Sequence, residues 1–254
     1  MKLRELHAAL EARIPKQYAC AWDNDGLMCT PDPEAEVRRV LCTLDVTDAA
    51  LHYAAENGYN VVLSHHPLIF HPLCALTPEN HIAEKVLFAV QNGISVLSYH
   101  TRFDAMPGGM NDLLAEALGL TRPEPFGDEE GKMGRIGFLP AETDIYDFCA
   151  QIKRALDSDA LLLARTHDTA YRVAVLGGDG KDFIYPAMSA GCDAFITGDA
   201  GYNMAGDAQE EGIVTIEAGH YHTEAPVLAV LERLVRESCG AEIGCFDSCT
   251  YSVI

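Results

Sequence analysis

The feature that most constrains the fold is a repeated strand–helix–strand order in the N-terminal part of the chain. The run 37–45 is rich in β-branched and apolar residues and predicts a strand, 48–57 predicts a helix, and 59–63 predicts a second strand. A helix at 82–91 and a strand at 94–99 repeat the pattern. Strands joined by helical crossovers pair in parallel. The sequence therefore predicts an α/β fold with a largely parallel sheet.

Two adjacent histidines, His65 and His66, follow the strand at 59–63. Pro67 favours a turn after them, and a turned backbone lets both imidazoles converge on one cleft or on two neighbouring metal ions. Neutral imidazole is a good ligand for Zn, Fe, Ni or Mn. The alternative is a solvent-facing loop with two chance histidines, or one core and one exposed histidine.

A second set of polar residues, His100 and Asp104, follows the strand at 94–99. Ligands bind at the carboxyl ends of strands in open α/β sheets, so both residues are candidates for a site. Asp104 has the alternative role of a helix or loop cap. Asn111 can cap the helix that it begins, and we predict a structural role for it.

A third set, His220 and Glu224, follows the strand at 213–218 and Gly219. We predict that Thr223 caps the final long helix, which would place Glu224 in its first turn. The helix macrodipole alone could account for a carboxylate there. The spacing His-x-x-x-Glu also allows both side chains to face one ion.

These three strand ends offer imidazoles and carboxylates that parallel strands would bring to one edge of a sheet. Three nitrogen and two carboxylate ligands exceed what one catalytic ion with an open position uses. They suit two ions with a bridging carboxylate, which predicts a dinuclear site. Zn, Fe, Mn and Ni all accept such mixed ligands, so the ligand set leaves the metal open.

The segment 121–132 is rich in proline, glycine and acid, and it predicts a domain boundary. A second α/β pattern follows. The glycine-rich run 177–181 predicts a tight strand-to-helix turn, with anion binding by its backbone N–H groups as the alternative. Asp199 follows another strand and is a candidate to contact the metal ligands without binding the metal itself.

Charge and cysteine usage exclude several classes of protein. A net charge of −20 argues against direct nucleic-acid contact. The nine cysteines include no Cys-x-x-Cys, which indicates reduced thiols and a cytoplasmic location. No apolar run reaches the ~20 residues that span a bilayer, and the acidic, amphipathic N-terminus is unlike a signal peptide.

Six short motifs occur in one order along the chain: Trp-Asp-Asn-x-Gly-Leu (22–27), Ser-His-His-Pro (64–67), His-Thr-x-x-Asp-x-x-x-Gly-Gly-x-Asn-Asp (100–112), Gly-Gly-x-Gly (177–180), Thr-Gly-Asp (197–199) and Gly-His-Tyr-x-Thr-Glu (219–224). Together they resemble the NGG-interacting factor three-like family. These YbgI-type dinuclear metal proteins are often called GTP cyclohydrolase I type 2 homologues.

The resemblance implies two related α/β domains, with the C-terminal segment returning to the first. Residues 1–123 plus 219–254 would form the metal-binding domain and 124–218 the second domain. It also implies a toroidal homo-hexamer built from dimers, with the metals facing an interior cavity. His100 matches a substrate-facing histidine and is the candidate general acid or base. The family's ligands for two divalent ions (Zn, Fe or Mn) map onto His65, His66, Asp104, His220 and Glu224.

Three positions depart from the family pattern, namely Asp25, Arg102 and Asn203. The family commonly has a hydrophobic residue, a small polar residue and a histidine there. The ligand set is unchanged by these departures. We predict that the three residues border the cavity and alter substrate preference.

The function that these observations favour is a dinuclear metal-dependent hydrolase acting on a nucleotide or related small molecule. The family name points to a purine nucleotide and to opening of the imidazole ring of GTP. The alternative is a non-catalytic metal-binding or metal-handling ring protein, and a third hypothesis is a regulatory interaction module.

Overall fold

The computed structural model describes residues 1–127 and 132–251, which form two compact units. Unit 1 contains Met1–Phe103 and Val227–Thr250, and unit 2 contains Asp104–Pro226 and Tyr251. The chain leaves the first unit, builds the second and returns to complete the first. This is the predicted α/β fold with a returning C-terminal segment.

The boundaries of these units differ from the division predicted at 1–123 plus 219–254 and 124–218. The helix and strand that follow Asp104 contact the second sheet, so they belong to unit 2 by their contacts. The segment 219–226 contacts the second sheet as well. The division taken from the family resemblance stays a prediction.

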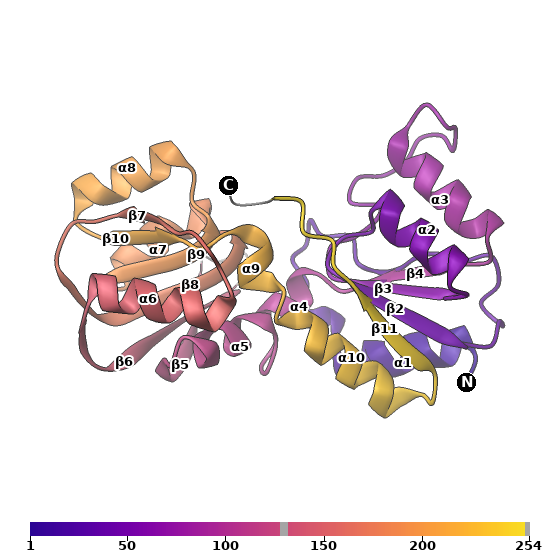
Figure 1. Cartoon of the computed structure of the whole chain (residues 1–254), viewed down its shortest axis with the longest axis horizontal. Coiled ribbons are helices and arrows are strands. Elements are labelled where there is room, and N and C mark those ends of the chain that lie inside the picture. Colours follow the sequence, from indigo (N-terminus) through magenta and orange to yellow (C-terminus); the bar gives the residue numbers. More distant parts are fainter. Residues whose placement is uncertain (128–131, 252–254) are drawn as a thin grey trace. The chain divides into compact units, whose positions relative to one another are not determined.

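Unit 1 is built on a five-stranded, mainly parallel sheet (Figure 1). Its strands are β1 (Gly26–Cys29), β2 (Arg39–Thr43), β3 (Val61–Ser64), β4 (Ser95–Ser98) and β11 (Glu242–Phe246). They lie in the order β1-β4-β3-β2-β11, and β1 alone among them is antiparallel to its neighbour. The C-terminal strand therefore extends the sheet beside β2.

The carboxyl ends of the three central strands of unit 1 are in register. Thr43 pairs with Ser64, and Ser64 pairs with Ser98. The residues that follow β2, β3 and β4 therefore leave the sheet at the same level. This register gives the physical reason why side chains distant in sequence meet at one edge.

Helices cover both faces of the unit 1 sheet, α2 and α3 on one face and α1 and α10 on the other, as Figure 1 shows. Thr47 caps α2 by accepting a hydrogen bond from the backbone N–H of Ala50 at 3.0 Å. Apolar residues such as Leu51, Val62 and Val96 are fully buried between sheet and helices. The helices are α1 (Leu3–Arg13), α2 (Asp48–Glu56), α3 (His81–Gln91) and α10 (Val227–Ser238), with a 3₁₀ turn at Lys16–Tyr18.

Unit 2 is built on a six-stranded mixed sheet. Its strands are β5 (Thr121–Phe126), β6 (Gly134–Asp144), β7 (Leu162–Ala164), β8 (Thr169–Asp179), β9 (Ala194–Asp199) and β10 (Val214–Glu217). They lie in the order β5-β6-β8-β9-β10-β7, and β8, β9 and β10 are parallel. These parallel strands supply the strand ends of the second unit.

The helices of unit 2 pack on this sheet. α5 and α9 contact each other and β8, whereas α7 and α8 contact each other. Phe126, Phe183 and Phe195 meet edge to face in the core at centroid distances of 6.0 and 6.2 Å. The helices are α5 (Met110–Ala117), α6 (Ile145–Leu156), α7 (Ile184–Ser189), α8 (Tyr202–Glu211) and α9 (His220–Glu224), with a 3₁₀ turn at Lys181–Phe183.

The predicted domain boundary at 121–132 is a strand in its first half. Thr121–Phe126 forms β5 and pairs with β6 despite two prolines. An edge strand tolerates proline because one row of its N–H groups has no partner strand. Residues 128–131 of the predicted boundary lie outside the described residues.

The glycine-rich run 177–181 also differs from the prediction of a strand-to-helix turn. Gly177 and Gly178 belong to β8, which continues to Asp179. The predicted turn comes later, at Gly180 before the 3₁₀ turn Lys181–Phe183. Glycine is needed at 178 because a neighbouring segment comes close to the strand: a Cβ there would collide with the carboxylate of Glu224.

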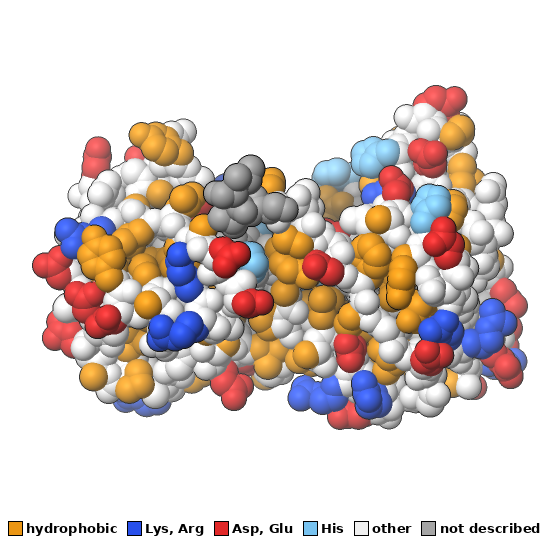
Figure 2. All heavy atoms as spheres, viewed as in Figure 1, with side chains coloured by type: hydrophobic (Ala, Val, Ile, Leu, Met, Phe, Trp, Pro, Cys, Tyr) orange, Lys and Arg blue, Asp and Glu red, His pale blue; other side chains and the backbone are white. Residues whose placement is uncertain are grey.

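The distribution of surface charge and the lengths of the apolar helices agree with what the net charge and the apolar runs of the sequence predict. Acidic side chains are spread over both units on the face shown in Figure 2, in keeping with the net charge of −20. Among the described residues, no helix is both long and apolar enough to span a membrane.

Candidate metal centre

Three imidazoles gather at the carboxyl ends of β3 and β4 in unit 1. His65, His66 and His100 each offer a ring nitrogen, and these nitrogens lie within 4.8 Å of one another. We call these three residues the imidazole cluster. His65 is fully buried and His66 is part-buried, so the predicted alternative of a solvent-facing loop is wrong.

Each imidazole of the cluster is held at Nδ1 by an oxygen. His65 Nδ1 lies 2.9 Å from the carbonyl oxygen of Tyr99, and His66 Nδ1 lies 2.7 Å from Asp45 Oδ1. A carbonyl or a carboxylate can only accept, so Nδ1 carries the hydrogen and donates it. This tautomer leaves a lone pair on Nε2, which is how metal-binding histidines are commonly oriented.

His100 is held in the same way by Asp23, whose side chain is fully buried. His100 Nδ1 donates to Asp23 Oδ1 at 2.9 Å, and Asp23 Oδ2 accepts from the N–H and the hydroxyl of Thr101 at 3.0 and 2.6 Å. Burial raises the pKa of Asp23, but its bonds to His100 and Thr101 lower it more, and the net pKa lies below the usual range. The carboxylate therefore stays ionised and fixes the His100 ring.

Unit 2 contains an imidazole–carboxylate pair on α9. His220 Nε2 lies 3.2 Å from Glu224 Oε2, and Glu224 is almost fully buried. His220 Nδ1 lies 2.7 Å from Asp199 Oδ2 at the end of β9. His220 is thus oriented like the imidazoles of unit 1, and Asp199 supports it as the sequence predicted.

The prediction that Thr223 caps the final long helix is wrong. Gly219, at φ +87°, starts the short helix α9, and the long helix begins only at Val227 after Pro226. The hydroxyl of Thr223 accepts a hydrogen bond from Gly178 N–H at 3.1 Å, which ties α9 to β8. His220 and Glu224 are therefore four residues apart on one short helix, side by side.

Asp104 lies in the short helix α4 (Thr101–Ala105) and is 7% exposed. Asn111 connects this helix to β8: its Nδ2 donates to the carbonyl of Asp104 at 3.4 Å, and its Oδ1 accepts from Gly177 N–H at 2.9 Å. Asn111 is fully buried and does not cap α5, whose N-cap is Gly109, so the predicted capping role is wrong; its side chain joins two backbone segments instead. Asp104, His220 and Glu224 all belong to unit 2. His220 and Glu224 lie close to Gly178, whereas Asp104 is linked to Gly177 through Asn111.

The sequence analysis missed two residues that orient the imidazoles, Asp45 and Tyr99. Asp45 lies two residues after the end of β2, just as His66 lies two residues after the end of β3. A search for carboxylates at this strand end could have found it. Tyr99 contributes only its backbone carbonyl, for which the sequence carries no signal.

Gly178 allows a first test of how the Glu224 carboxylate is held. Its φ of +70° strains any other residue, and an added Cβ would collide with Glu224 Oε1. We expect Gly178→Ala to lower both the thermal unfolding temperature and the metal content. Gly58→Ala is the matched control, because Gly58 has φ +71° and nothing within 4 Å of an added Cβ.

The control variant should lose only the cost of placing alanine in a left-handed backbone conformation, about 1–2 kcal/mol of unfolding free energy. An equal loss of stability in both variants, with metal content unchanged, would contradict a close fit between Gly178 and Glu224.

Asp199→Ala tests the support of His220. We expect about a 10- to 100-fold loss of metal affinity, the usual effect of removing a carboxylate that orients a ligating histidine. Asp179→Ala is the matched control, because Asp179 lies opposite Asp199 in the β8–β9 register but pairs with Lys181 at 2.7 Å. Competition with a chelator of known affinity measures the change, and equal affinities for the two variants would reject the prediction.

The chain matches the model of the Duf34/NIF3 (NGG1p interacting factor 3) family over residues 1–250. This chain belongs to the Duf34/NIF3 family. The match covers both units and all the predicted site residues, and the family is the one that the six motifs resemble.

Relatives of this Duf34/NIF3 protein match it over nearly their full length. A Clostridium perfringens protein named GTP cyclohydrolase 1 type 2 homolog is 31% identical over 249 residues, covering 96% of this chain and 94% of the relative. A Lactococcus lactis protein of the same name is 33% identical over 247 residues, covering 96% and 95%. Among solved structures, reduced HcgD from Methanocaldococcus jannaschii has a TM-score of 0.86 at 27% identity, covering 96% and 97%.

Asp25 and Arg102, two of the three residues that depart from the family pattern, face each other in the interior of unit 1. Arg102 Nε donates to Asp25 Oδ2 at 2.7 Å, and both side chains are 1% exposed. The same guanidinium donates to both oxygens of Glu11 at 2.8 and 2.9 Å and to the carbonyl of Ile14 at 2.9 Å. The prediction that Asp25 and Arg102 border the cavity is therefore wrong: they form a buried ion pair.

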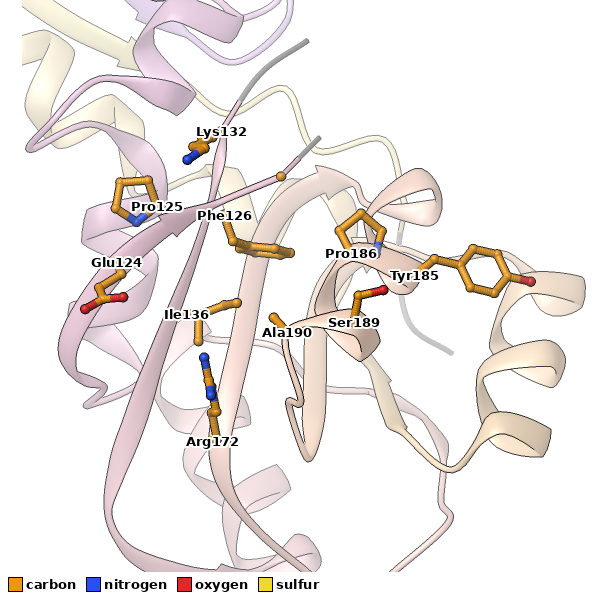
Figure 3. Close-up of a pocket in the computed structure, with 11 residues that line it drawn as sticks. Glu124, Pro125, Phe126, Lys132, Ile136, Arg172, Tyr185, Pro186, Ser189 and Ala190 are labelled. Carbon is orange, nitrogen blue, oxygen red and sulfur yellow. The ribbon is translucent and has the colours of Figure 1, made fainter. Parts of the chain in front are cut away.

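Unit 2 of this Duf34/NIF3 protein also contains a cavity of about 570 Å³ (Figure 3). Apolar residues such as Phe126 and Ile136 line it, together with the charged residues Glu124, Lys132 and Arg172. Its described lining residues include no histidine or cysteine, so it lacks the donors that transition metals prefer.

Proposed function

We propose that this protein binds two divalent metal ions through His65, His66, Asp104, His220 and Glu224, and that it uses them to hydrolyse a nucleotide or a related small molecule. The reaction closest to the names of its relatives is opening of the purine ring of GTP. Zn, Fe and Mn all accept this mixture of nitrogen and oxygen ligands.

The observation that carries this proposal is the common orientation of the imidazoles. Nδ1 of His65, His66 and His220 is bound to an oxygen in each case, so Nε2 keeps its lone pair. Buried carboxylates accompany them in Asp104 and Glu224. Three imidazoles and two carboxylates fit a pair of ions with mixed nitrogen and oxygen ligands.

The metal ions, His100 and Asp23 would have different roles in the reaction. When bound, two divalent ions supply an activated water at neutral pH and polarise the bond under attack. His100, fixed through Nδ1 by Asp23, presents Nε2 as the general acid or base. The buried Asp23 keeps this ring in one orientation through the reaction.

The test is incubation of protein loaded with Zn, Fe or Mn with GTP, followed by measurement of formate and of purine absorbance. Formate release that is lost in His100→Gln, while metal content stays normal, is the expected result. Normal metal content without turnover of GTP would reject the cyclohydrolase activity. Absence of turnover across a panel of nucleotides and phosphoesters would favour the metal-handling alternative instead.

We also propose that the protein works in the cytoplasm as a toroidal homo-hexamer. What supports this proposal is the family resemblance, which the match over residues 1–250 extends to both units. Analytical ultracentrifugation of untagged protein tests this state, and a stable monomer or dimer would reject it.

A further inference from the structure

Two aromatic side chains of unit 1 are exposed to solvent beside the imidazole cluster. Trp22 is 52% exposed and Phe70 is 40% exposed. Their rings meet edge to face, with centroids 6.0 Å apart and planes at 63°. Large aromatic side chains gain most by being buried, so a contiguous exposed pair marks a binding surface more often than single exposed residues do.

The exposed pair is continuous with the imidazole cluster. The ring of His100 meets Trp22 at 6.4 Å and Phe70 at 6.2 Å, and it meets His65 at 5.4 Å and His66 at 5.6 Å. His100 is thus the shared neighbour of the ligand-type imidazoles and the exposed aromatics. A ring placed on Trp22 and Phe70 would lie next to the candidate acid–base group.

The loops that carry the two aromatics are fixed by hydrogen bonds. Asp23, directly after Trp22, is fully buried and bonds to His100 and Thr101. The side chain of Asn24 donates to the carbonyl of Ile69, directly before Phe70. These hydrogen bonds join the two loops and hold Trp22 and Phe70 in their exposed positions.

We propose that Trp22 and Phe70 form a platform that binds a planar heteroaromatic ring of the substrate, which stacks on one of the two inclined rings and meets the other edge to face. The proposal rests on the proposed function, because it concerns the substrate of the same site. Stacking uses the π faces of ligand and protein and needs no cationic partner, which suits a chain with a net charge of −20. The platform would hold the ring while its reactive part faces His100.

The test uses the intrinsic fluorescence of Trp22, the single tryptophan of the chain. The full-length protein, metal-free and metal-loaded, is titrated with guanosine, which carries the ring without phosphates. Saturable quenching by guanosine is expected, since a base stacked on Trp22 changes its emission. Ribose 5-phosphate, which lacks the ring, should leave the emission unchanged.

Variants at Phe70 separate stacking from simple apolar contact. Phe70→Leu keeps apolar volume without a π face and should weaken guanosine binding about fivefold to a hundredfold. Phe70→Tyr should restore it. Tyr202→Ala is the control, because Tyr202 is a 92% exposed aromatic of unit 2 and should not affect binding. Metal content should be the same in all three variants.

The outcomes distinguish this proposal from the proposed function. Normal metal binding without saturable quenching, or equal quenching by ribose 5-phosphate, overturns the platform alone. Emission that changes with protein concentration and not with guanosine also overturns it, and identifies Trp22 and Phe70 as a contact between copies. Saturable quenching by guanosine in a protein that takes up no metal even when metal is supplied supports the platform and overturns the metal centre.

Discussion

His65→Ala is expected to abolish metal binding at the centre. His65 is fully buried, and the bond of its Nδ1 to the Tyr99 carbonyl leaves the lone pair on Nε2. Loss of a residue that merely orients a ligand costs about 10- to 100-fold in affinity, and loss of the ligand itself should cost more than about 100-fold. Metal analysis of untagged protein, purified without added metal, should find the wild type loaded and the variant empty.

His81→Ala is the control for this experiment, since His81 is an exposed histidine at the start of α3 in the same unit. Circular dichroism and thermal unfolding establish that the variants fold. His65→Gln serves as a second variant should alanine leave a damaging cavity. Wild-type metal content in either folded His65 variant would contradict the ligand assignment.

Glu224→Gln extends the test to the second unit. The proposal names Glu224 among the ligands of the two ions, so this variant should also lose metal. Retention of all metal in Glu224→Gln and its loss in His65→Ala would instead assign metal binding to the imidazole cluster alone.

Arg102→Met is expected to cause the largest loss of stability among the substitutions considered. The guanidinium is almost completely buried and neutralises Asp25, which is equally buried. Removing one partner of a buried ion pair leaves an uncompensated charge and typically costs about 3–5 kcal/mol of unfolding free energy. Denaturant unfolding of the variant and the wild type measures the difference.

A double-mutant cycle with Asp25→Leu tests whether the two departures compensate for each other. Replacing a whole buried pair by apolar side chains is often neutral, so Asp25→Leu/Arg102→Met should be more stable than the sum of the single losses predicts. Glu11 then loses its partner too, but its side chain is 31% exposed and water can solvate it. Additive losses would contradict a direct interaction between Asp25 and Arg102.

The same cluster predicts a dependence of stability on pH. Burial raises the pKa of Glu11, but the hydrogen bonds and charge of Arg102 lower it more, so the folded-state pKa lies below the usual value. Glu11 therefore contributes stability above its unfolded pKa and loses that contribution as the pH falls through the folded pKa. Glu11→Gln should abolish this acid-side loss, and an unchanged pH profile in this variant would contradict the assignment.

The candidate site residues could be predicted from the sequence because each set follows a recognisable strand. His65, His66 and His100 come directly after apolar, β-branched runs, and parallel strands must end at a common edge. The register of Thr43, Ser64 and Ser98 fulfils that expectation. The family resemblance supplied the ligand assignment of His220 and Glu224 from the last motif.

Other features depended on contacts that no local pattern records. Thr223 looked like a helix cap because serine and threonine favour that position, yet its hydroxyl bonds to Gly178 across unit 2. Gly178 looked like part of a turn, but it lies in a strand against which Glu224 packs. Asp25 and Arg102 are 77 residues apart and were assigned to a cavity, although they neutralise each other in the interior.

The sequence by itself determined the α/β fold, the family and the residues able to bind metal, because hydrophobic periodicity and short motifs are local properties of a chain. Only the tertiary structure decided the tautomer of each imidazole, the partner of each buried charge and the exposure of Trp22 beside His100. Those properties depend on which distant atoms come within hydrogen-bonding or ring-contact distance, and packing alone sets that distance.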